Sequence, residues 1–236
     1  RIVHANAHQT DSAACEMRVF QATFLALGGP SLRFTRSRFF SQKHPVSDLA
    51  VSSEPDQQMT DLSRYRPNVG VAIFNREGSL LVGERVQPAG AWQLPQGGIN
   101  EGETPEEAAW RELWEETGLQ KGECSVELVG QVPGDPLTYD FPENAGGFFK
   151  KQGFIGQAQY FFLFFSEDDG LPSKTDLTGK GGEPPEFTRM EWRPFPEVVD
   201  GIVEFKRPVY AELQSRSVPM IESFLKSRNA DMKSKG

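Results

Sequence analysis

Three glutamates in the segment 97–119 have the spacing of a metal site. Glu112, Glu115 and Glu116 stand at i, i+3 and i+4, so on a helix their side chains share one face. Like charges on one face repel one another and destabilise an isolated helix. Mg²⁺ takes carboxylate oxygens as ligands, keeps several waters and bridges to substrate phosphates. A divalent cation would therefore relieve the repulsion; the alternative is an acidic face that is only solvated.

Capping signals at both ends define the helix that positions these glutamates. Thr104 is a good N-cap, Pro105 suits the first helical position, and Glu107 completes a Thr-x-x-Glu capping box. Gly118 stands where a left-handed C-cap is wanted. We therefore predict a helix over 105–117. Its opposite face carries the residues that can be buried: Trp110, Leu113, Trp114 and Thr117.

Composition limits the class of protein. With 236 residues, 37% of them hydrophobic, the chain can form one compact domain with extensions. A formal net charge of −8 argues against a dedicated nucleic-acid surface, although a small nucleotide can still bind through metal ions. No apolar run reaches membrane-spanning length. We expect a monomer that binds a small nucleotide substrate and no membrane.

Cysteine and histidine are poorly placed for chemistry. Cys15 and Cys124 lie far apart and have no metal-ligand neighbours, so a disulfide framework or a zinc site is not expected. The histidines, His4, His8 and His44, all precede the predicted domain. Histidine is thereby nearly excluded as a catalytic base, and carboxylates remain as proton acceptors.

Residues 1–62 differ in composition from the rest of the chain. Between Met17 and Ser47 there is no Asp or Glu, while five Lys and Arg residues and many hydroxyl residues are present. Such a composition is typical of an organelle transit peptide, and the alternative is an ordinary disordered extension. We predict a disordered extension that directs the protein to a chloroplast or mitochondrion. A cytoplasmic location follows if it is not a targeting signal.

The predicted domain covers 63–225, and residues 226–236 are expected to be a flexible tail. β-prone segments separated by turn residues predict strands at 68–74, 80–85, 126–132, 158–165 and 187–192. Helices are expected at about 195–202 and 208–224. Strands interrupted by a few helices indicate the α+β class, with helices packed on a mixed sheet.

The glutamate segment matches a known family motif at each specified position. It reads G-x5-E-x7-R-E-U-x-E-E-x-G-U, with U a bulky apolar residue, from Gly97 to Leu119. The chain therefore resembles the Nudix hydrolases, which cleave nucleoside diphosphates linked to another moiety. The resemblance implies an α/β/α sandwich with a mixed sheet. It also implies that Arg111 pairs with Glu103, and that Mg²⁺ or Mn²⁺ is held by Glu112, Glu115 and Glu116.

Further segments narrow the resemblance. Residues 65–70 (YRPNVG), 92–98 (WQLPQGG), 156–159 (GQAQ), 185–187 (PEF) and 205–210 (FKRPVY) are similar to those of plant and bacterial diadenosine tetraphosphate hydrolases. That group includes the bacterial RNA pyrophosphohydrolase. Residues 139–142 (YDFP) look more like the plant enzymes, which also favours the chloroplast over the mitochondrion.

The same resemblance assigns residues outside the helix. Glu186 would be a further metal ligand or the general base, with a surface glutamate as the alternative. Arg66 would bind phosphate through its guanidinium fork, unless it only forms a salt bridge at the domain edge. The phosphate channel would be lined by Gln96, Gly97 and Gly98. Tyr139 would stack on an adenine, or else belong to the core.

One position departs from the family pattern. A basic residue usually follows the GQxQ stretch, whereas this chain has Tyr160. Lys150 or Lys151, from a glycine-rich loop, are candidates to replace that cation. The sequence leaves the question open.

The resulting expectation is Mg²⁺-dependent hydrolysis of a phosphoanhydride bond. Glu115 or Glu186 would take the proton of the attacking water, and diadenosine tetraphosphate would give ATP and AMP. The nearer alternative is an RNA 5′-pyrophosphohydrolase, which would want a basic track leading from the site. An alternative of another class is a non-catalytic nucleotide-binding sensor, which the intact motif disfavours.

Overall fold

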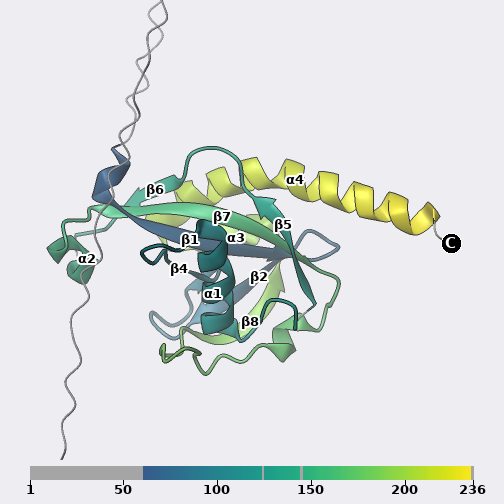
Figure 1. The fold of residues 1–236 in the computed structure, drawn as a ribbon, viewed down its shortest axis with the longest axis horizontal. Helices are drawn as coiled ribbons and strands as arrows, with labels where there is room; N and C mark the ends of the chain where they lie inside the picture. Colours follow the sequence, from purple (N-terminus) through teal and green to yellow (C-terminus); the bar gives the residue numbers. More distant parts are fainter. Residues whose placement is uncertain (1–60, 124, 144–145, 235–236) are drawn as a thin grey trace, which may run out of the picture. The chain divides into compact units, whose positions relative to one another are not determined.

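A mixed β-sheet is the centre of the fold. The computed structural model describes residues 61–123, 125–143 and 146–234, which belong to one compact unit (Figure 1). The sheet order is β3-β2-β1-β7-β5, with β4 paired to β1, β6 to β7 and β8 to β2. The strands are β1 (Tyr65–Phe74), β2 (Leu80–Arg85), β3 (Trp92–Gln93), β4 (Gln96–Gly98), β5 (Val126–Gln131), β6 (Leu137–Asp140), β7 (Gly156–Ser166) and β8 (Phe187–Arg193).

The central strands β1 and β7 run parallel, from Tyr65 opposite Gly156 to Phe74 opposite Phe165. Their near-continuous apolar sequences suit this position, because a central strand of a sheet with both faces covered is buried on both sides. The other pairings given for the sheet are antiparallel. The sheet is therefore mixed, as the sequence predicts.

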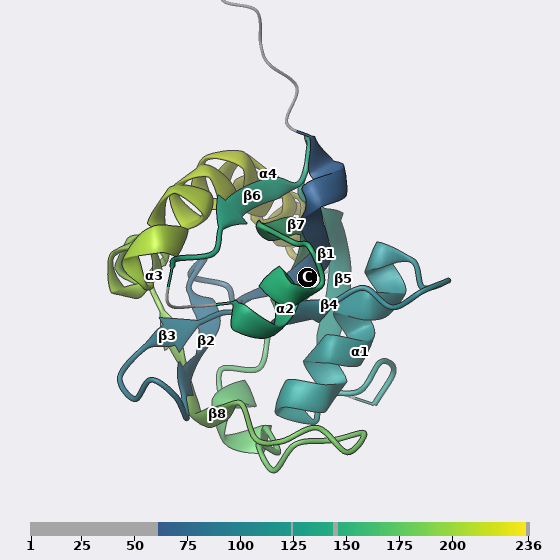
Figure 2. The same cartoon turned by 90° about the vertical axis from the view of Figure 1, so that its left-hand side faces the viewer.

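Helices cover both faces of the sheet. Side chains of β1 alternate between two cores, with Val71 and Ile73 in one and Ala72 and Phe74 in the other. Helix α1 (Pro105–Thr117) packs on the first core, and α3 (Phe195–Gly201) and α4 (Arg207–Ser234) pack on the second. Figure 2 shows α1 and the α3–α4 pair on opposite sides of the sheet. The predicted α+β class and α/β/α sandwich are confirmed.

Helix α1 has the bounds and caps that the sequence predicts. The Thr104 hydroxyl accepts a hydrogen bond from the Glu107 backbone N–H at 3.3 Å, and the Glu107 carboxylate accepts one from the Thr104 backbone N–H at 2.9 Å. Gly118 closes the helix with φ of 71°, a conformation that favours glycine. Leu113 is fully buried at the sheet. The helix is thus fixed at both ends before any ligand binds.

The last helix is longer than predicted. The helix that was expected to end near 224 continues to Ser234 as α4. The flexibility of residues 226–236 stays a prediction. Arg228 accounts for part of the extension: its guanidinium pairs with Glu127 at 2.6 Å and Glu167 at 2.8 Å. It also lies 4.8 Å from the Phe165 ring centroid. These long-range contacts attach the helix to the sheet.

Short helices that the sequence analysis does not predict complete the described chain. Helix α2 (Gly147–Lys151) lies between β6 and β7, and three 3₁₀ turns are η1 (Leu62–Arg64), η2 (Leu171–Lys174) and η3 (Glu204–Lys206). Among the described residues, no helix is long and apolar enough to cross a membrane. The transit-like segment lies outside the described residues.

Candidate active site

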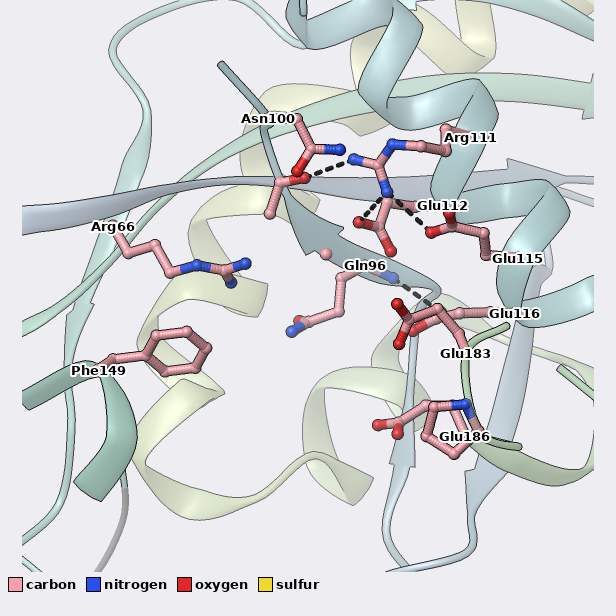
Figure 3. A pocket seen from close by; sticks show the side chains of 13 residues that line it. Arg66, Gln96, Asn100, Arg111, Glu112, Glu115, Glu116, Phe149, Glu183 and Glu186 are labelled. Carbon is pink, nitrogen blue, oxygen red and sulfur yellow. Dashed lines mark hydrogen bonds and ion pairs between the residues drawn. The ribbon is translucent and has the colours of Figure 1, made fainter. Parts of the chain in front are cut away.

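A pocket of about 480 Å³ collects most of the predicted site residues. It is bounded by α1, β4, the start of β1, α2 and the loop before β8 (Figure 3). Its lining residues are Arg66, Gln96, Gly97, Gly98, Asn100, Arg111, Glu112, Glu115, Glu116, Phe149, Glu183, Pro184 and Glu186. Two predicted residues are absent from this lining: Glu103, which pairs with Arg111, and Tyr139, which is buried next to the pocket.

The two glycines of β4 give room to charged side chains. A Cβ at Gly97 would lie about 2 Å from the Glu112 carboxylate, and one at Gly98 would lie 1.9 Å from an Arg66 guanidinium nitrogen. Both distances are shorter than any real contact, so a side chain at either position would displace its neighbour. Gly97 and Gly98 therefore let Glu112 and Arg66 reach into the pocket across the strand.

Arg111 is the centre of a charged network. Its guanidinium makes two bonds to Glu103, at 2.8 and 2.9 Å, and one to the Gly98 carbonyl oxygen at 2.6 Å. The remaining nitrogen donates to Glu112 at 2.7 Å and to Glu115 at 2.8 Å. The hydrogen bonds from Arg111 also lower the pKa of the Glu103 carboxyl. Arg111 thus orients the acidic face of α1, in the pairing that the resemblance implies.

Glu116 and Glu112 are carboxylates in an unfavourable environment. Burial raises the pKa of Glu116 well above its usual value, and the nearby charges of Glu112 and Glu186 raise it further. One hydrogen bond, from the Gln96 backbone N–H at 3.0 Å, acts in the opposite direction. Burial also raises the pKa of Glu112, although Arg111 partly offsets it. The negative charge of the site is therefore only partly compensated by its own cationic side chains.

The excess negative charge bears on whether the residues of the pocket fit a metal ion. Among the described residues, no three acidic, histidine or cysteine side chains stand close enough together, as placed, to hold a metal ion. Arg111 accounts for part of this, because it pairs with Glu112 and Glu115. The donors are nevertheless carboxylate oxygens that repel one another around Glu116, which is the chemistry a hard divalent cation relieves. The residues fit a hard divalent cation by donor type and charge.

Glu186 enters the pocket from the loop before β8. Arg85 holds its carboxylate at 2.6 Å and also donates to the Gln93 side chain at 3.0 Å. The Val86 backbone N–H donates to the Glu186 carbonyl oxygen at 2.9 Å. Arg85 and Gln93 were not singled out from the sequence, because their position beside Glu186 depends on the pairing of β2 with both β3 and β8.

A buried lysine supports the pocket floor. The Lys206 ammonium donates to the Gln96 side-chain oxygen at 3.0 Å, and Gln159 donates to the same oxygen at 3.1 Å. Burial, together with Arg85, lowers the pKa of Lys206 to about 8, against the opposing effect of Glu116 and Glu186. Sequence analysis missed this residue, although it lies in the FKRPVY segment.

Tyr139 is a core residue in this structure. Its ring is 8% exposed and contacts the rings of Phe141 and Phe205, with centroids 6.2 and 5.5 Å away. Its hydroxyl donates to the Gln157 side chain. Stacking on an adenine requires an open ring face, so this packing supports the alternative of a core role.

The basic residue that the family has after the GQxQ stretch has no direct replacement among the residues that line the pocket. Tyr160 lies half-buried on β7. The Lys150 ammonium donates to the carbonyl oxygens of Pro142 at 2.6 Å and Glu143 at 3.1 Å, and neither Lys150 nor Lys151 lines the pocket. Instead, Phe149 from α2 lines the pocket beside Arg66. No sequence signal indicated this role for Phe149.

The comparisons with known proteins identify the family. The fold and the carboxylate pocket are those expected of a hydrolase that acts on linked nucleoside diphosphates. A family model described as NUDIX domain matches residues 64–213, more than half of the chain. The chain belongs to the Nudix family.

Two curated relatives are similar over most of their own length. The RNA pyrophosphohydrolase of Cereibacter sphaeroides is 44% identical over 150 residues, covering 63% of this chain and 88% of the relative. The Arabidopsis thaliana protein named Nudix hydrolase 26, chloroplastic, is 41% identical over 154 residues, covering 64% and 68%. A solved structure of a C. elegans Ap4A hydrolase binary complex has a TM-score of 0.45 and 16% identity, covering 64% of this chain and 96% of that chain.

Proposed function

We propose that this protein is a divalent-metal-dependent pyrophosphohydrolase that removes pyrophosphate from 5′-triphosphorylated RNA. The observation that carries the proposal is the pocket, with carboxylates of α1 and Glu186 on one side and Arg66 on the other. Phosphate groups bound between them would meet both metal ligands and a guanidinium. The choice of RNA is supported by the bacterial relatives at 41–44% identity that carry this name. It replaces our preference from sequence for dinucleoside polyphosphates.

The chain's own residues would divide the work as follows. Glu112, Glu115, Glu116 and Glu186 would hold Mg²⁺ or Mn²⁺, which supplies Lewis acidity and lowers the pKa of a bound water. Glu115 or Glu186 would accept the proton of a water molecule that attacks phosphorus in line, and the α–β phosphoanhydride bond would break. Pyrophosphate would leave, and the RNA would keep a 5′-monophosphate.

A second candidate is hydrolysis of diadenosine tetraphosphate to ATP and AMP. The YDFP segment at 139–142, which resembles the plant enzymes, and the net charge of −8 favour it. A single experiment separates the two. Full-length protein and Mg²⁺ are given triphosphorylated RNA or diadenosine tetraphosphate at equal concentration, and the products are quantified with time.

The expected result is pyrophosphate release from RNA at a higher rate than formation of ATP and AMP. EDTA should abolish both reactions, and Mg²⁺ should restore them. The reverse preference would establish the dinucleoside polyphosphate activity. Nucleotide binding without metal-dependent product would instead identify a sensor.

A chloroplast location is part of the proposal and is supported by the name of the Arabidopsis relative. The residues that would direct it lie outside the described part of the chain. The monomeric state also stays a prediction.

The buried lysine gives a further prediction for this reaction. We expect Lys206→Met to lower kcat by about 10- to 100-fold, the range for residues that orient a metal site from outside its ligand shell. The reason is that Lys206 fixes the side chain of Gln96, whose backbone N–H binds Glu116. The melting temperature should stay constant or rise, because Met buries without the desolvation penalty of an ammonium.

Steady-state kinetics and thermal unfolding check this prediction. Lys226→Met, at an exposed lysine of α4, is the matched control and should change neither quantity. A fall in melting temperature that accounts for the lost activity would show that Lys206 is only structural.

A further inference from the structure

The rim of the pocket opposite Glu116 and Glu186 is aromatic and basic. Phe149 of α2 lines the pocket, and the Arg66 guanidinium carbon lies 4.4 Å from its ring centroid. Figure 3 shows Arg66 and Phe149 together on this side. The preceding residue, Phe148, lies edge-on to Phe149 at 5.4 Å and is 69% exposed. Aromatic rings therefore extend from the pocket to the solvent.

The helix that displays these rings is held in place by its own contacts. Phe149 stacks on Phe141, with centroids 6.0 Å apart and planes at 20°. The Lys150 ammonium donates to the Pro142 carbonyl oxygen at 2.6 Å. These contacts tie α2 to the segment after β6. Phe148 is consequently presented to solvent by a fixed element beside the site.

Exposure alone would not indicate a site, because isolated apolar side chains are common on protein surfaces. The position of Phe148 is more informative. Its ring contacts, edge-on, the Phe149 ring that lines the pocket, and the exposed Lys151 is on the same short helix. Nucleobases stack on aromatic rings, and Lys or Arg neutralises the phosphates between them.

We propose that Phe148, supported by Phe149, is a stacking platform for an unpaired nucleobase of the RNA substrate. The RNA chain would leave the phosphate pocket on the side of Arg66 and Phe149, and Lys151, two residues after Phe149, would contact its backbone phosphates. The identity of the substrate rests on the proposed function. Arg66 and Lys151 are the basic side chains beside this platform, in a protein whose net charge is −8.

Binding without turnover tests this proposal. Full-length protein in EDTA is titrated against a 3′-labelled, 5′-triphosphorylated single-stranded hexanucleotide, and the Kd is measured by fluorescence anisotropy. A second oligonucleotide is abasic at every position after the first. Phe148→Ala is expected to raise the Kd of the normal oligonucleotide about tenfold, within the range for loss of one base–aromatic stack. The Kd of the abasic oligonucleotide should not change.

Two further variants sharpen the result. Phe148→Trp should restore tight binding, because a larger ring keeps the stacking surface. Leu62→Ala removes another exposed apolar side chain that does not line the pocket, and it should bind both oligonucleotides as the wild type does.

Each contrary outcome has a separate meaning. Equal Kd values for wild type and Phe148→Ala, or equal losses with both oligonucleotides, would overturn the platform. A loss confined to diadenosine tetraphosphate, titrated in parallel, would overturn RNA as its occupant. Base-dependent RNA binding that requires Phe148, without pyrophosphate release when Mg²⁺ is added, would overturn the proposed function and leave the platform standing.

Discussion

Glu116→Gln is expected to fold normally and to lose turnover by about 10²- to 10⁴-fold, since metal charge stabilisation is worth several kcal/mol and about 1.4 kcal/mol is tenfold. The substitution keeps an oxygen that can accept the hydrogen bond from the Gln96 backbone N–H, which is 3.0 Å long in the native protein. It removes the negative charge that a divalent cation needs. The check is kcat with saturating substrate over a titration of Mg²⁺.

Stability should change in the opposite direction to activity. Burial, with the charges of Glu112 and Glu186, raises the pKa of Glu116, so the ionised carboxylate is disfavoured in the metal-free protein. A neutral glutamine should therefore melt at the same or a higher temperature in EDTA. Mg²⁺ should stabilise the wild type more than the variant, because an ion that binds the native state raises its stability.

The control for this variant is Glu197→Gln, at an exposed position of α3, which should alter neither kinetics nor melting. Nearly unchanged turnover in purified, folded Glu116→Gln would rule out a metal-binding role for Glu116. A lower melting temperature of Glu116→Gln in EDTA would instead show that the charge of Glu116 stabilises the metal-free protein.

Local signals account for what the sequence predicted well. The cap residues Thr104 and Gly118 are close in sequence to the helix they end, and the three glutamates owe their common face to helical geometry alone. The strands β1 and β7 could also be found from apolar runs. These features need no knowledge of long-range packing.

The missed features depend on contacts between distant segments. The end of α4 is fixed by Arg228, whose partners on and after other strands cannot be read from the helix itself. Lys206 reaches Gln96 across more than a hundred residues of sequence. Tyr139 lies on a strand whose position depends on the pairing of β6 with β7, and in this structure the residue is buried; its role in substrate binding stays a prediction.

Substrate preference was the other feature that could not be predicted from the sequence. The motif on α1 encodes metal and phosphate chemistry, which an RNA 5′ end and a dinucleoside polyphosphate share. Discrimination depends on what lies beyond the phosphates. In this chain Phe148 and Phe149 occupy that region, and the structure had to bring α2 to the rim of the pocket before they could be noticed.

Arg111→Met should be the most destabilising of the substitutions considered. We expect a loss of about 2–4 kcal/mol in the free energy of unfolding without metal, because removing one partner of a partly buried ion-pair network leaves uncompensated charge. Arg111 pairs with Glu103, Glu112 and Glu115, and its side chain is 24% exposed. Methionine preserves much of the aliphatic packing and none of these bonds. Urea unfolding in EDTA measures the loss.

Metal should compensate part of that loss. With Arg111 absent, Glu112 and Glu115 are released to a cation, so Mg²⁺ should raise the stability of the variant more than that of the wild type. Turnover should still fall, because the carboxylates lose the group that orients them. Glu103→Gln should cost less in both respects, since Glu103 pairs with Arg111 from outside the pocket lining.

Arg76→Met is the matched control, because Arg76 forms an exposed pair with Glu167 at 3.0 Å. Such surface pairs contribute about 0–1 kcal/mol. If Arg111→Met loses no more stability than this control, the network around Arg111 is as well solvated as a surface pair. If it loses more and Mg²⁺ restores nothing, the released carboxylates do not form a metal site. Only a large loss that Mg²⁺ partly reverses agrees with an arginine and a cation that share the same carboxylates.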